Sequence, residues 1–544
     1  MSNFHQYKKR IWILALCLVF SAWNYKRLVD YFEISKNLDI LAEVYRKVNQ
    51  SYVNDVMPGE LIRVAIDAML KSLDPYTNYY SEAQTEEFRL RTSGSYDGIG
   101  FILANRKNKI IVKEVLEGFP ADLAGVLVAD EILRINDQAV EGKKSKELAP
   151  LLYGSPGTRL SVVVRRGQKE IEFDLERGKV DLKNVTHAEQ IEDGFTYVKL
   201  AGFSSNAAKE IKESIAKIGQ GKTTEGIIID LRGNGGGLLM EAIKIVNLFI
   251  PKNQLVVDTK GRLKEENRTY KTFESPLDTN IHLAILIDGG SASASEIVAG
   301  SLQDYDRAIL IGQKSFGKGL VQKPMLLSYN TQMKITVSKY FLPSGRLIQA
   351  LEYKQFGKPT QSQKNNNYFT KNKRQVKSGQ GITPDVWVQN KGAEETIDLL
   401  QRNWLIFDFV SLLQKRYGKT NHRFRLTDKD YKYFKAFVQE NDSNFESTKV
   451  MAIKSLVVNA QETQKHELAK KLEEALLLSK RIDYNKLDSF KNEIKRQIEM
   501  EYVQRYHYKK GAVQNAIEND VVLKKAIGIL KDEQTYDQML KKKR

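Results

Sequence analysis

Residues 36–90 form the first part of the chain with a regular hydrophobic pattern. Apolar residues recur there at three- and four-residue spacing, as in LDILAEVYRKVNQSYV and GELIRVAIDAMLKSL. This spacing predicts an N-terminal helical region, closed by the proline turn of SLDPYTNYYSE. Residues 91–177 change to short strand-like runs such as KIIVKEVL and RLSVVVRR, with turns between them. They predict a small β-rich module.

The pattern changes twice more along the chain. Residues 181–390 alternate apolar strands with amphipathic helices, as in FTYVKLAGF, NAAKEIKESIAKI, GIIIDLRG and LMEAIKIVNLFI. Such alternation predicts an α/β layer fold. Residues 391–544 contain no proline and are rich in Lys, Glu and Leu, so they predict an all-helical region. A chain of 544 residues is also too long for a single core, so several domains are expected.

Residues 1–30 have the pattern of an export segment. Lys8, Lys9 and Arg10 precede the apolar run IWILALCLVFSAW, which has the length of a signal-peptide core. The run is short for a full membrane span of about 20 residues. A cleaved signal peptide and a retained N-terminal membrane anchor both fit, and in either case we expect the rest of the chain to be exported.

Composition narrows the classes of partner and cofactor. The net charge is +18, but basic residues are interleaved with acidic ones and form no basic and aromatic stripe. This favours a solvated basic surface and no nucleic-acid partner. The single cysteine, Cys17, lies in the export segment, so no disulfide or thiolate metal site is expected in the mature domains. No metal-ligand spacing and no cofactor-binding motif is present, so we expect neither a metal nor a cofactor.

The stretch GGSASASEIVAG, residues 289–300, contains three serines after the apolar strand HLAILID. Ser293 and Glu296 have the spacing of a helix capping box. However, the carboxyl end of a strand in an α/β fold, at a helix N-terminus, is also where reactive groups gather. The sequence pattern thus leaves open whether Ser293 is a cap, a nucleophile or both.

A serine nucleophile needs a base. His282 starts the strand that leads to the serines, so it should lie at the far end of that strand, and nothing places His187 near a serine. Lys318, in the glycine-flanked stretch SFGKGLVQ, is the other candidate, since burial lowers the pKa of a lysine. Gln322, four residues later, could orient its amine. The alternative for Lys318 is an exposed loop lysine.

These motifs together resemble the carboxy-terminal processing peptidases, also called tail-specific proteases. The resemblance rests on GGSASASEIVAGSLQD followed by SFGKGLVQ, with 25 residues from Ser293 to Lys318, and on SLDPYTNYYSE, DLRGNGGG, SKYFLPSGRLIQ and GITPDVWV. The β-rich module resembles the PDZ domain of that family, through YDGIGF and GFPADLAGVLVADEILRINDQAV. The family implies an α/β protease core with an inserted PDZ domain, an N-terminal helical segment and a C-terminal all-helical region.

The resemblance also implies roles for individual residues. Ser293 would be the nucleophile, Lys318 the general base and Gln322 the residue that holds the lysine. The oxyanion hole would use the N–H of Ala294 and one from the glycine loop, assigned to Gly236. The family further implies that a peptide C-terminus binds the N–H groups of Gly98, Ile99, Gly100 and Phe101, the PDZ carboxylate loop.

The function implied is an exported bacterial serine endopeptidase, periplasmic or anchored to the inner membrane, that cleaves near protein C-termini. Its partners would be proteins or peptides with exposed C-termini, and dimerisation through the helical ends stays open. One alternative is a catalytically inactive PDZ scaffold that binds tails without cleaving them. Another is an acyl-transfer enzyme on a related α/β core.

Overall fold

The computed structural model describes residues 31–82, 84–85, 93–191, 194–220, 224–353, 358–361, 366–388, 393–441 and 445–541. The predicted export segment, residues 1–30, lies outside them. Among the described residues, no helix combines the length and the apolar character that a membrane span requires. The chain divides into two compact units, and residues 1–79 form most of the first.

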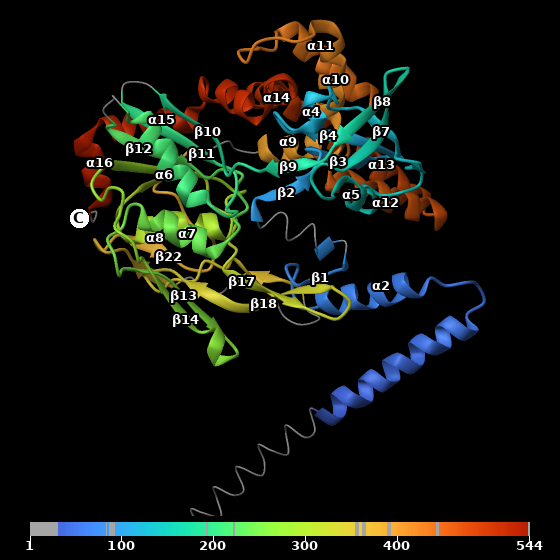
Figure 1. Cartoon of the computed structure of the whole chain (residues 1–544). Coiled ribbons are helices and arrows are strands. Elements are labelled where there is room, and N and C mark those ends of the chain that lie inside the picture. The colour runs from blue at the N-terminus through green and yellow to red at the C-terminus, as the bar shows by residue number, and fades with distance from the viewer. Residues whose placement is uncertain are drawn as a thin grey trace, which may run out of the picture. The chain divides into compact units, whose positions relative to one another are not determined.

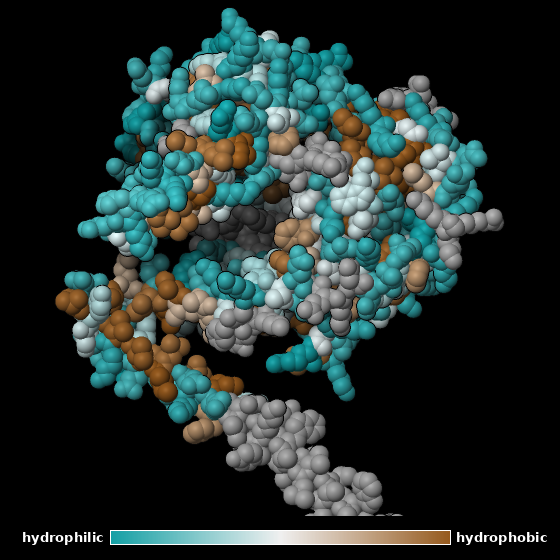
Figure 2. Space-filling view, turned by 180° about the vertical axis from the view of Figure 1, so that it is seen from behind, coloured by the Kyte–Doolittle hydropathy of each residue, from teal (hydrophilic) through white to brown (hydrophobic). Residues whose placement is uncertain are grey.

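The first unit consists of helices, as the sequence pattern predicts. Residues 31–51 are helical, and α2 (Pro58–Lys71) follows, with proline in its first turn, where its missing N–H is tolerated. The short strand β1 (Asn78–Tyr80) lies where the chain passes from this unit into the second. Large apolar side chains of both helices are exposed, including Leu38 and Met69. In Figure 2, brown patches mark apolar residues along the segment next to the grey N-terminal residues.

The β-rich module is an antiparallel sheet of order β3-β4-β5-β7-β8, with β6 paired to β5, and a separate pair of β2 with β9. Its core contains the inward-facing residues of these strands, and α5 supplies Leu148 and Leu152. β3 is an edge strand. The strands and helices are β2 (Ser95–Gly98), β3 (Phe101–Arg106), β4 (Lys109–Val115), α4 (Pro120–Leu123), β5 (Glu131–Ile135), β6 (Gln138–Ala139), α5 (Ser145–Leu152), β7 (Arg159–Arg166), β8 (Lys169–Glu176) and β9 (Gly178–Asp181).

A six-stranded sheet of order β10-β11-β12-β15-β16-β23 forms the centre of the α/β region. β10 is antiparallel to β11, and the other neighbours are parallel. The elements are β10 (Val185–Ile191), β11 (Phe195–Leu200), α6 (Ala207–Ile218), β12 (Gly226–Asp230), α7 (Leu239–Asn247), β15 (His282–Ile287), α8 (Ala294–Asp304), β16 (Ile309–Gly312) and β23 (Val386–Trp387). Both faces of the sheet are covered, which explains why its central strands β12, β15 and β16 consist almost entirely of apolar residues.

The two faces of this sheet are covered by different parts of the chain. Because side chains alternate along a strand, Ile227 and Ile229 face α6, α7 and α8, whereas Ile228 faces the opposite side. That opposite side packs against α15 (Val521–Lys531) and α16 (Glu533–Leu540), the last helices of the chain. Figure 1 shows α15 beside β12, with α16 at the same side of the sheet.

A second sheet packs against α7 and α8. In it β17 pairs with β18, β18 with β13 and β13 with β14. The Ser301 hydroxyl of α8 donates to the Val256 carbonyl of β13 at 3.0 Å. The remaining elements of this region are β13 (Leu255–Gly261), η1 (Lys264–Glu266), β14 (Arg268–Lys271), β17 (Leu320–Leu326), β18 (Gln332–Phe341), β19 (Leu351–Glu352), β20 (Thr360–Gln361), β21 (Asn367–Phe369) and β22 (Gln375–Lys377).

The C-terminal region is helical, as predicted, but its helices belong to two cores. The first six are α9 (Ala393–Arg402), α10 (Leu405–Tyr417), α11 (Asp428–Glu440), α12 (Thr448–Glu462), α13 (His466–Ser489) and α14 (Lys491–Ile517). Of these six helices, all but α12 contribute side chains to their own apolar centre, which includes Phe409, Phe434 and Tyr502, and α12 packs against α13. α15 and α16 instead complete the α/β layer, a division that the helical pattern alone does not show. The predicted fold class is confirmed: an α/β core, a β-rich domain and helices at both ends.

Candidate active site

The serine stretch lies between the end of β15 and the start of α8. Ser293 is the residue before the first turn of α8, and its backbone has φ 56° and ψ −112°. An ordinary helix N-cap is extended, so this conformation is unusual for a residue with a side chain. Strain of this kind costs about 1–3 kcal/mol and is found mostly where function requires it.

The other two serines of the stretch, Ser291 and Ser295, have structural roles. The Ser291 hydroxyl donates to the Leu231 carbonyl at 2.8 Å, and the Ser295 hydroxyl donates to the Asn234 carbonyl at 2.8 Å. Both side chains are fully buried, whereas Ser293 is partly exposed. These bonds attach the serine stretch to the loop after β12.

That loop, DLRGNGGG, approaches the serine closely because it is rich in glycine. A Cβ atom on Gly236, where φ is +95°, would lie 2.8 Å from the Ala294 nitrogen and 2.7 Å from the Ala292 carbonyl oxygen. Gly236 therefore lies beside Ala294, as the predicted oxyanion hole requires. The Gly236 N–H, however, donates to the Asn234 Oδ1 at 2.9 Å. The Ala294 N–H belongs to the first turn of α8, whose N–H groups have no partner within the helix.

Glu296 joins the serine stretch to the Lys318 loop. Its carboxylate accepts from the Ser293 N–H (2.8 Å) and the Lys318 N–H (2.9 Å) on Oε2. Oε1 accepts from the Gly317 N–H (2.7 Å) and the Ser315 hydroxyl (2.5 Å). The Ser293 bond is the glutamate half of the predicted capping box. The other three bonds reach a segment about twenty residues away along the chain, which the capping pattern does not predict.

Tyr340, on β18, makes a second link between the same two segments. Its hydroxyl lies 2.5 Å from the Lys318 carbonyl oxygen and 3.2 Å from the Ser293 carbonyl oxygen. Glu296 thus connects the backbone N–H groups of Ser293 and Lys318, and Tyr340 connects their carbonyls. The structure brings the backbones of the two predicted catalytic residues together at the carboxyl ends of β15 and β16.

The electrostatics of this link follow from burial. Glu296 is fully buried, and burial raises the pKa of its carboxyl from 4.5 to about 7, although its four hydrogen bonds favour the charged form. Burial and the nearby Glu296 charge also raise the pKa of Tyr340 well above its usual value. The Tyr340 hydroxyl is therefore protonated and remains a hydrogen-bond donor at neutral pH.

Gln322 lies on β17, four residues after Lys318, as the sequence predicts. Its side-chain amide donates to the Thr336 hydroxyl of β18 at 3.3 Å. A register irregularity between Val321 and Gln322 displaces the strand at this point. This hydrogen bond of the Gln322 side chain links β17 to β18 in the second sheet.

A buried charged network supports the glycine loop from behind. Asp230, the last residue of β12, accepts from Arg232 Nη2 (2.6 Å), Lys199 Nζ (3.0 Å) and the Tyr197 hydroxyl (2.7 Å). Arg232 also pairs with Asp520, at 2.5 Å and 3.1 Å. Asp520 caps α15 by accepting from the N–H groups of Val522 and Leu523. Burial opposes the charge on Asp230, but Arg232 and Lys199 outweigh it and hold its pKa well below the usual range.

Asp304, at the end of α8, has a structural position. Its carboxylate pairs with Arg346 Nη2 at 2.8 Å, and both side chains are only 1% exposed. It also accepts from the Ser344 N–H at 2.9 Å. The pair joins α8 to the segment after β18.

The histidines considered for catalysis have other contacts. His282, at the start of β15, stacks on Tyr536 and lies 3.3 Å from the Leu530 carbonyl oxygen, at the opposite end of the strand from Ser293. His187 lies on the edge strand β10, 3.3 Å from the Glu189 carboxylate.

The predicted carboxylate loop of the β-rich domain joins β2 to its edge strand β3. Ile99 and Phe101 are buried in the domain core. Gly100 has φ +83°, and a Cβ atom there would lie 2.4 Å from the Cβ of Phe119. The backbone of the loop can thus turn sharply into β3. An edge strand leaves a row of backbone groups that a peptide can pair with.

Tyr340 and Asp520 are the residues of the site that sequence reasoning missed. Tyr340 lies inside SKYFLPSGRLIQ, a stretch that was noted, but nothing in its spacing indicates a bond to Lys318. Asp520 has an ordinary capping position at the start of α15, and no sequence signal relates it to Arg232, 288 residues earlier.

Comparison with known families gives three matches along the chain. Residues 194–354 match peptidase family S41, residues 98–176 match the PDZ domain family, and residues 396–530 match the C-terminal helical domain of probable PDZ-proteases. The chain is also 33% identical over 315 residues to a "Probable CtpA-like serine protease" of Staphylococcus aureus strain RF122, and 34% identical to the one of Staphylococcus epidermidis. These alignments cover 57% of this chain and 62% and 63% of the relatives, so the chain spans about three fifths of their length.

Among solved structures, the photosystem II D1 C-terminal processing protease aligns with 64% of this chain and 92% of its own, at 25% identity. The TM-score is 0.35, so this alignment carries no detailed comparison of the two structures.

Proposed function

We propose that this chain, a PDZ-containing member of peptidase family S41, is a serine endopeptidase that cleaves protein substrates near their C-termini with Ser293 and Lys318. The observation that carries the proposal is the double link between these two residues. Ser293 has a strained backbone at the start of α8, and Glu296 and Tyr340 hold it against the Lys318 loop. A cap alone would need neither the strain nor the link.

The proposed reaction follows from these positions. The neutral Lys318 amine takes the proton of the Ser293 hydroxyl as Oγ attacks the scissile carbonyl carbon. The carbonyl oxygen becomes an oxyanion, which the Ala294 N–H stabilises together with an N–H of the glycine loop. Collapse of the intermediate expels the amine, which takes the proton from Lys318, and leaves an acyl ester on Ser293. Water, deprotonated by Lys318, then hydrolyses that ester.

The PDZ domain supplies substrate recognition in this proposal. A peptide adds as a strand to the free edge of β3, and its C-terminal carboxylate accepts from N–H groups of residues 98–101. We propose that residues 1–30 direct the chain out of the cytoplasm, as a signal peptide or an anchor. Fractionation of cells that express the full chain, followed by N-terminal sequencing, tests this point.

The catalytic experiment uses a protein substrate with an exposed apolar tail, and the products are identified by mass. Ser293→Ala and Lys318→Ala should each lower the cleavage rate by a factor of about 10³ or more, with unchanged circular dichroism. Matched controls are Ser328→Ala, which removes an exposed hydroxyl from the turn between β17 and β18, and Lys323→Ala, which removes an exposed lysine from β17, the strand that follows the Lys318 loop. If a catalytic variant retains the wild-type rate, its proposed role is wrong.

A catalytically inactive PDZ scaffold is the second candidate, and two contacts favour it. The Gly236 N–H donates to Asn234, and the Gln322 amide donates to Thr336, so neither has the contact that its predicted role requires. A scaffold would bind the tailed substrate and leave it intact. Binding by the wild-type chain with no product after prolonged incubation would support this function.

A further inference from the structure

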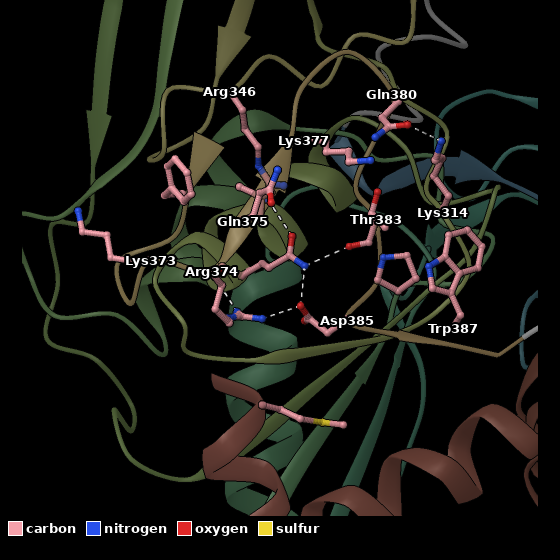
Figure 3. Close-up of a pocket in the computed structure, with 15 residues that line it drawn as sticks. Lys314, Arg346, Lys373, Arg374, Gln375, Lys377, Gln380, Thr383, Asp385 and Trp387 are labelled. Atoms are coloured by element: carbon pink, nitrogen blue, oxygen red, sulfur yellow. Dashed lines mark hydrogen bonds and ion pairs between the residues drawn. The ribbon is translucent and has the colours of Figure 1, made fainter. Parts of the chain in front are cut away.

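A cavity of about 740 Å³ opens beside the Lys318 loop, outside the groove of the PDZ domain. Its walls are the β21–β22 hairpin, the segment that leads into β23, and Lys314, which follows β16. Figure 3 shows these side chains around the space. The volume lies in the range of ligand pockets, about 300–1,000 Å³.

The floor of the cavity is a rigid network with its charges paired. Arg374 pairs with Asp306 and Asp385, both at 2.6 Å. Gln303 donates to Asp385 at 3.0 Å and accepts from Arg346 at 2.9 Å. Arg346 in turn pairs with Asp304. The arginines are therefore neutralised by their own carboxylates, and this floor does not need a ligand for its stability.

The rim differs from the floor because its cations are lysines without acidic partners. Among the described residues, Lys314, Lys373 and Lys377 have no carboxylate within ion-pair distance. The Lys314 amine donates to the neutral Gln380 amide oxygen at 3.0 Å. In Figure 3, Lys314 and Lys377 lie on one side of the cavity and Lys373 on the other. The rim thus presents positive charge at two separated places.

Two aromatic residues also line the cavity. Phe369 is 54% exposed and Trp387 is 52% exposed, although both are large apolar side chains. Exposed aromatic rings offer contact area to apolar side chains, and the lysines of the same cavity attract carboxylates. A single small anion would contact only one of the two charged places.

The cavity wall is hydrogen-bonded to the proposed catalytic loop. Ser315, next to Lys314, accepts from the Ile382 N–H at 2.6 Å and donates its own N–H to the Ile382 carbonyl at 3.0 Å. The Ser315 hydroxyl also donates to Glu296. A polypeptide that binds Lys314 in the cavity would therefore lie next to Ser315, whose contacts hold the Lys318 loop.

We propose that this cavity is a subsite for an acidic segment of the polypeptide substrate. Lys314 and Lys377 take the carboxylates of Asp or Glu side chains, and Trp387 and Phe369 take the apolar side chains between them. The subsite rests on the proposed function, because it needs a polypeptide substrate. It adds a preference for acidic residues that the PDZ domain, which recognises a C-terminus, does not supply.

The test measures binding in the Ser293→Ala chain, so that cleavage does not interfere. The ligand is a peptide with three glutamates between apolar residues, amidated at its C-terminus to remove the carboxylate that a PDZ domain reads. The comparison peptide has glutamine in place of glutamate. At low salt the glutamate peptide should bind about tenfold more tightly or better, and the difference should shrink as salt is raised.

Substitutions of residues that line the cavity test whether the peptide binds there. Lys314→Gln combined with Lys377→Gln should abolish the preference for glutamate, while Lys212→Gln combined with Lys252→Gln removes the same charge elsewhere on the surface and should leave it intact. A peptide-induced change in tryptophan fluorescence should disappear in Trp387→Phe.

Three results would overturn the subsite: equal affinity for the two peptides, an unchanged preference in the cavity variant, or full competition by inorganic phosphate, which would indicate a small-anion site. Cleavage of a tailed substrate by the wild-type chain is measured separately. Cleavage without a preference for glutamate would support the protease and contradict the subsite. A preference for glutamate without cleavage would support the binding site and contradict the protease.

Discussion

Two buried carboxylates support the candidate site from opposite sides, and they are stabilised differently. Glu296 holds the Lys318 loop through neutral donors only: three backbone N–H groups and one hydroxyl. Asp230 holds the glycine loop through Arg232 and Lys199. Burial raises the pKa of Glu296 to about 7, whereas the two cations lower that of Asp230.

The difference shows that the hydrogen-bond partners of a buried carboxylate determine how its charge responds to pH. A carboxylate with cationic partners stays charged at every physiological pH, so the glycine loop keeps its support. A carboxylate with neutral partners lies near its titration point at neutral pH. Of the two carboxylates, Glu296 is therefore the one whose contact, between Ser293 and Lys318, depends on pH.

The largest expected effect comes from removing the charged support. Asp230→Ala leaves Lys199 without its carboxylate and Arg232 with only Asp520, in a site that excludes water. We expect the free energy of unfolding to fall by about 3–5 kcal/mol, measured by urea denaturation. Asp258→Ala, which removes a partly exposed acid from β13, is the control. A loss below about 1 kcal/mol would show that the network is not needed.

The next largest effect is the pH dependence of the stability that Glu296 contributes to the fold. Below pH 4.5 the carboxyl is protonated in both the folded and the unfolded chain, and above pH 7 it is ionised in both. Between these values only the unfolded chain releases the proton, so the stability contributed by Glu296 falls as pH rises. The total fall is about 3 kcal/mol.

Urea denaturation of the wild type and of Glu296→Gln between pH 4 and pH 8 isolates this contribution, since the variant cannot titrate at this position. The difference in unfolding free energy between the two chains should change across the window from pH 4.5 to about 7. A difference that is constant with pH would contradict the raised pKa. Asp230 should behave in the opposite way, since its lowered pKa makes its contribution disappear only as pH falls into the acid range.

Asp520→Ala tests whether the end of the chain supports the glycine loop. The substitution removes one carboxylate from Arg232 and also the cap of α15, so we expect a loss of about 2–3 kcal/mol in unfolding free energy. Asp532→Ala is the matched control, because Asp532 caps α16 by accepting from the Thr535 N–H at 3.0 Å and does not contact Arg232. That control should lose clearly less, because an exposed cap contributes little and Asp532 has no arginine partner among the described residues. Equal losses in the two variants would mean that the Arg232 contact contributes nothing.

The smallest expected effect is that of Tyr340→Phe. It removes one hydroxyl from the carbonyls of Lys318 and Ser293 and leaves the ring buried, at a cost of about 1 kcal/mol in stability. Because the hydroxyl acts on the position of the Lys318 loop, the turnover number in a peptide cleavage assay should fall while KM stays similar. A change in KM alone would place the role of Tyr340 in substrate binding.

Much of the fold can be predicted from the sequence because its elements have strong local patterns. The alternation of strands and helices over residues 181–390 predicts the α/β sheet, and the short strands of residues 91–177 predict the β-rich domain. The serine stretch is also correctly placed, between an apolar strand and a helix. The domain boundaries at residues 90, 177 and 390 and the roles of Ser293, Lys318 and Gln322 stay predictions.

The sequence by itself determined which elements form and which residue types meet at the carboxyl edge of the sheet. It did so because burial and periodicity act over short distances along the chain. Only the tertiary structure decided that Glu296 spans from a capping position to the Lys318 loop, that Tyr340 closes the same link, and that α15 and α16 cover the sheet. These contacts join segments that are about twenty to almost three hundred residues apart. Their formation depends on packing of the whole core, which no local pattern encodes.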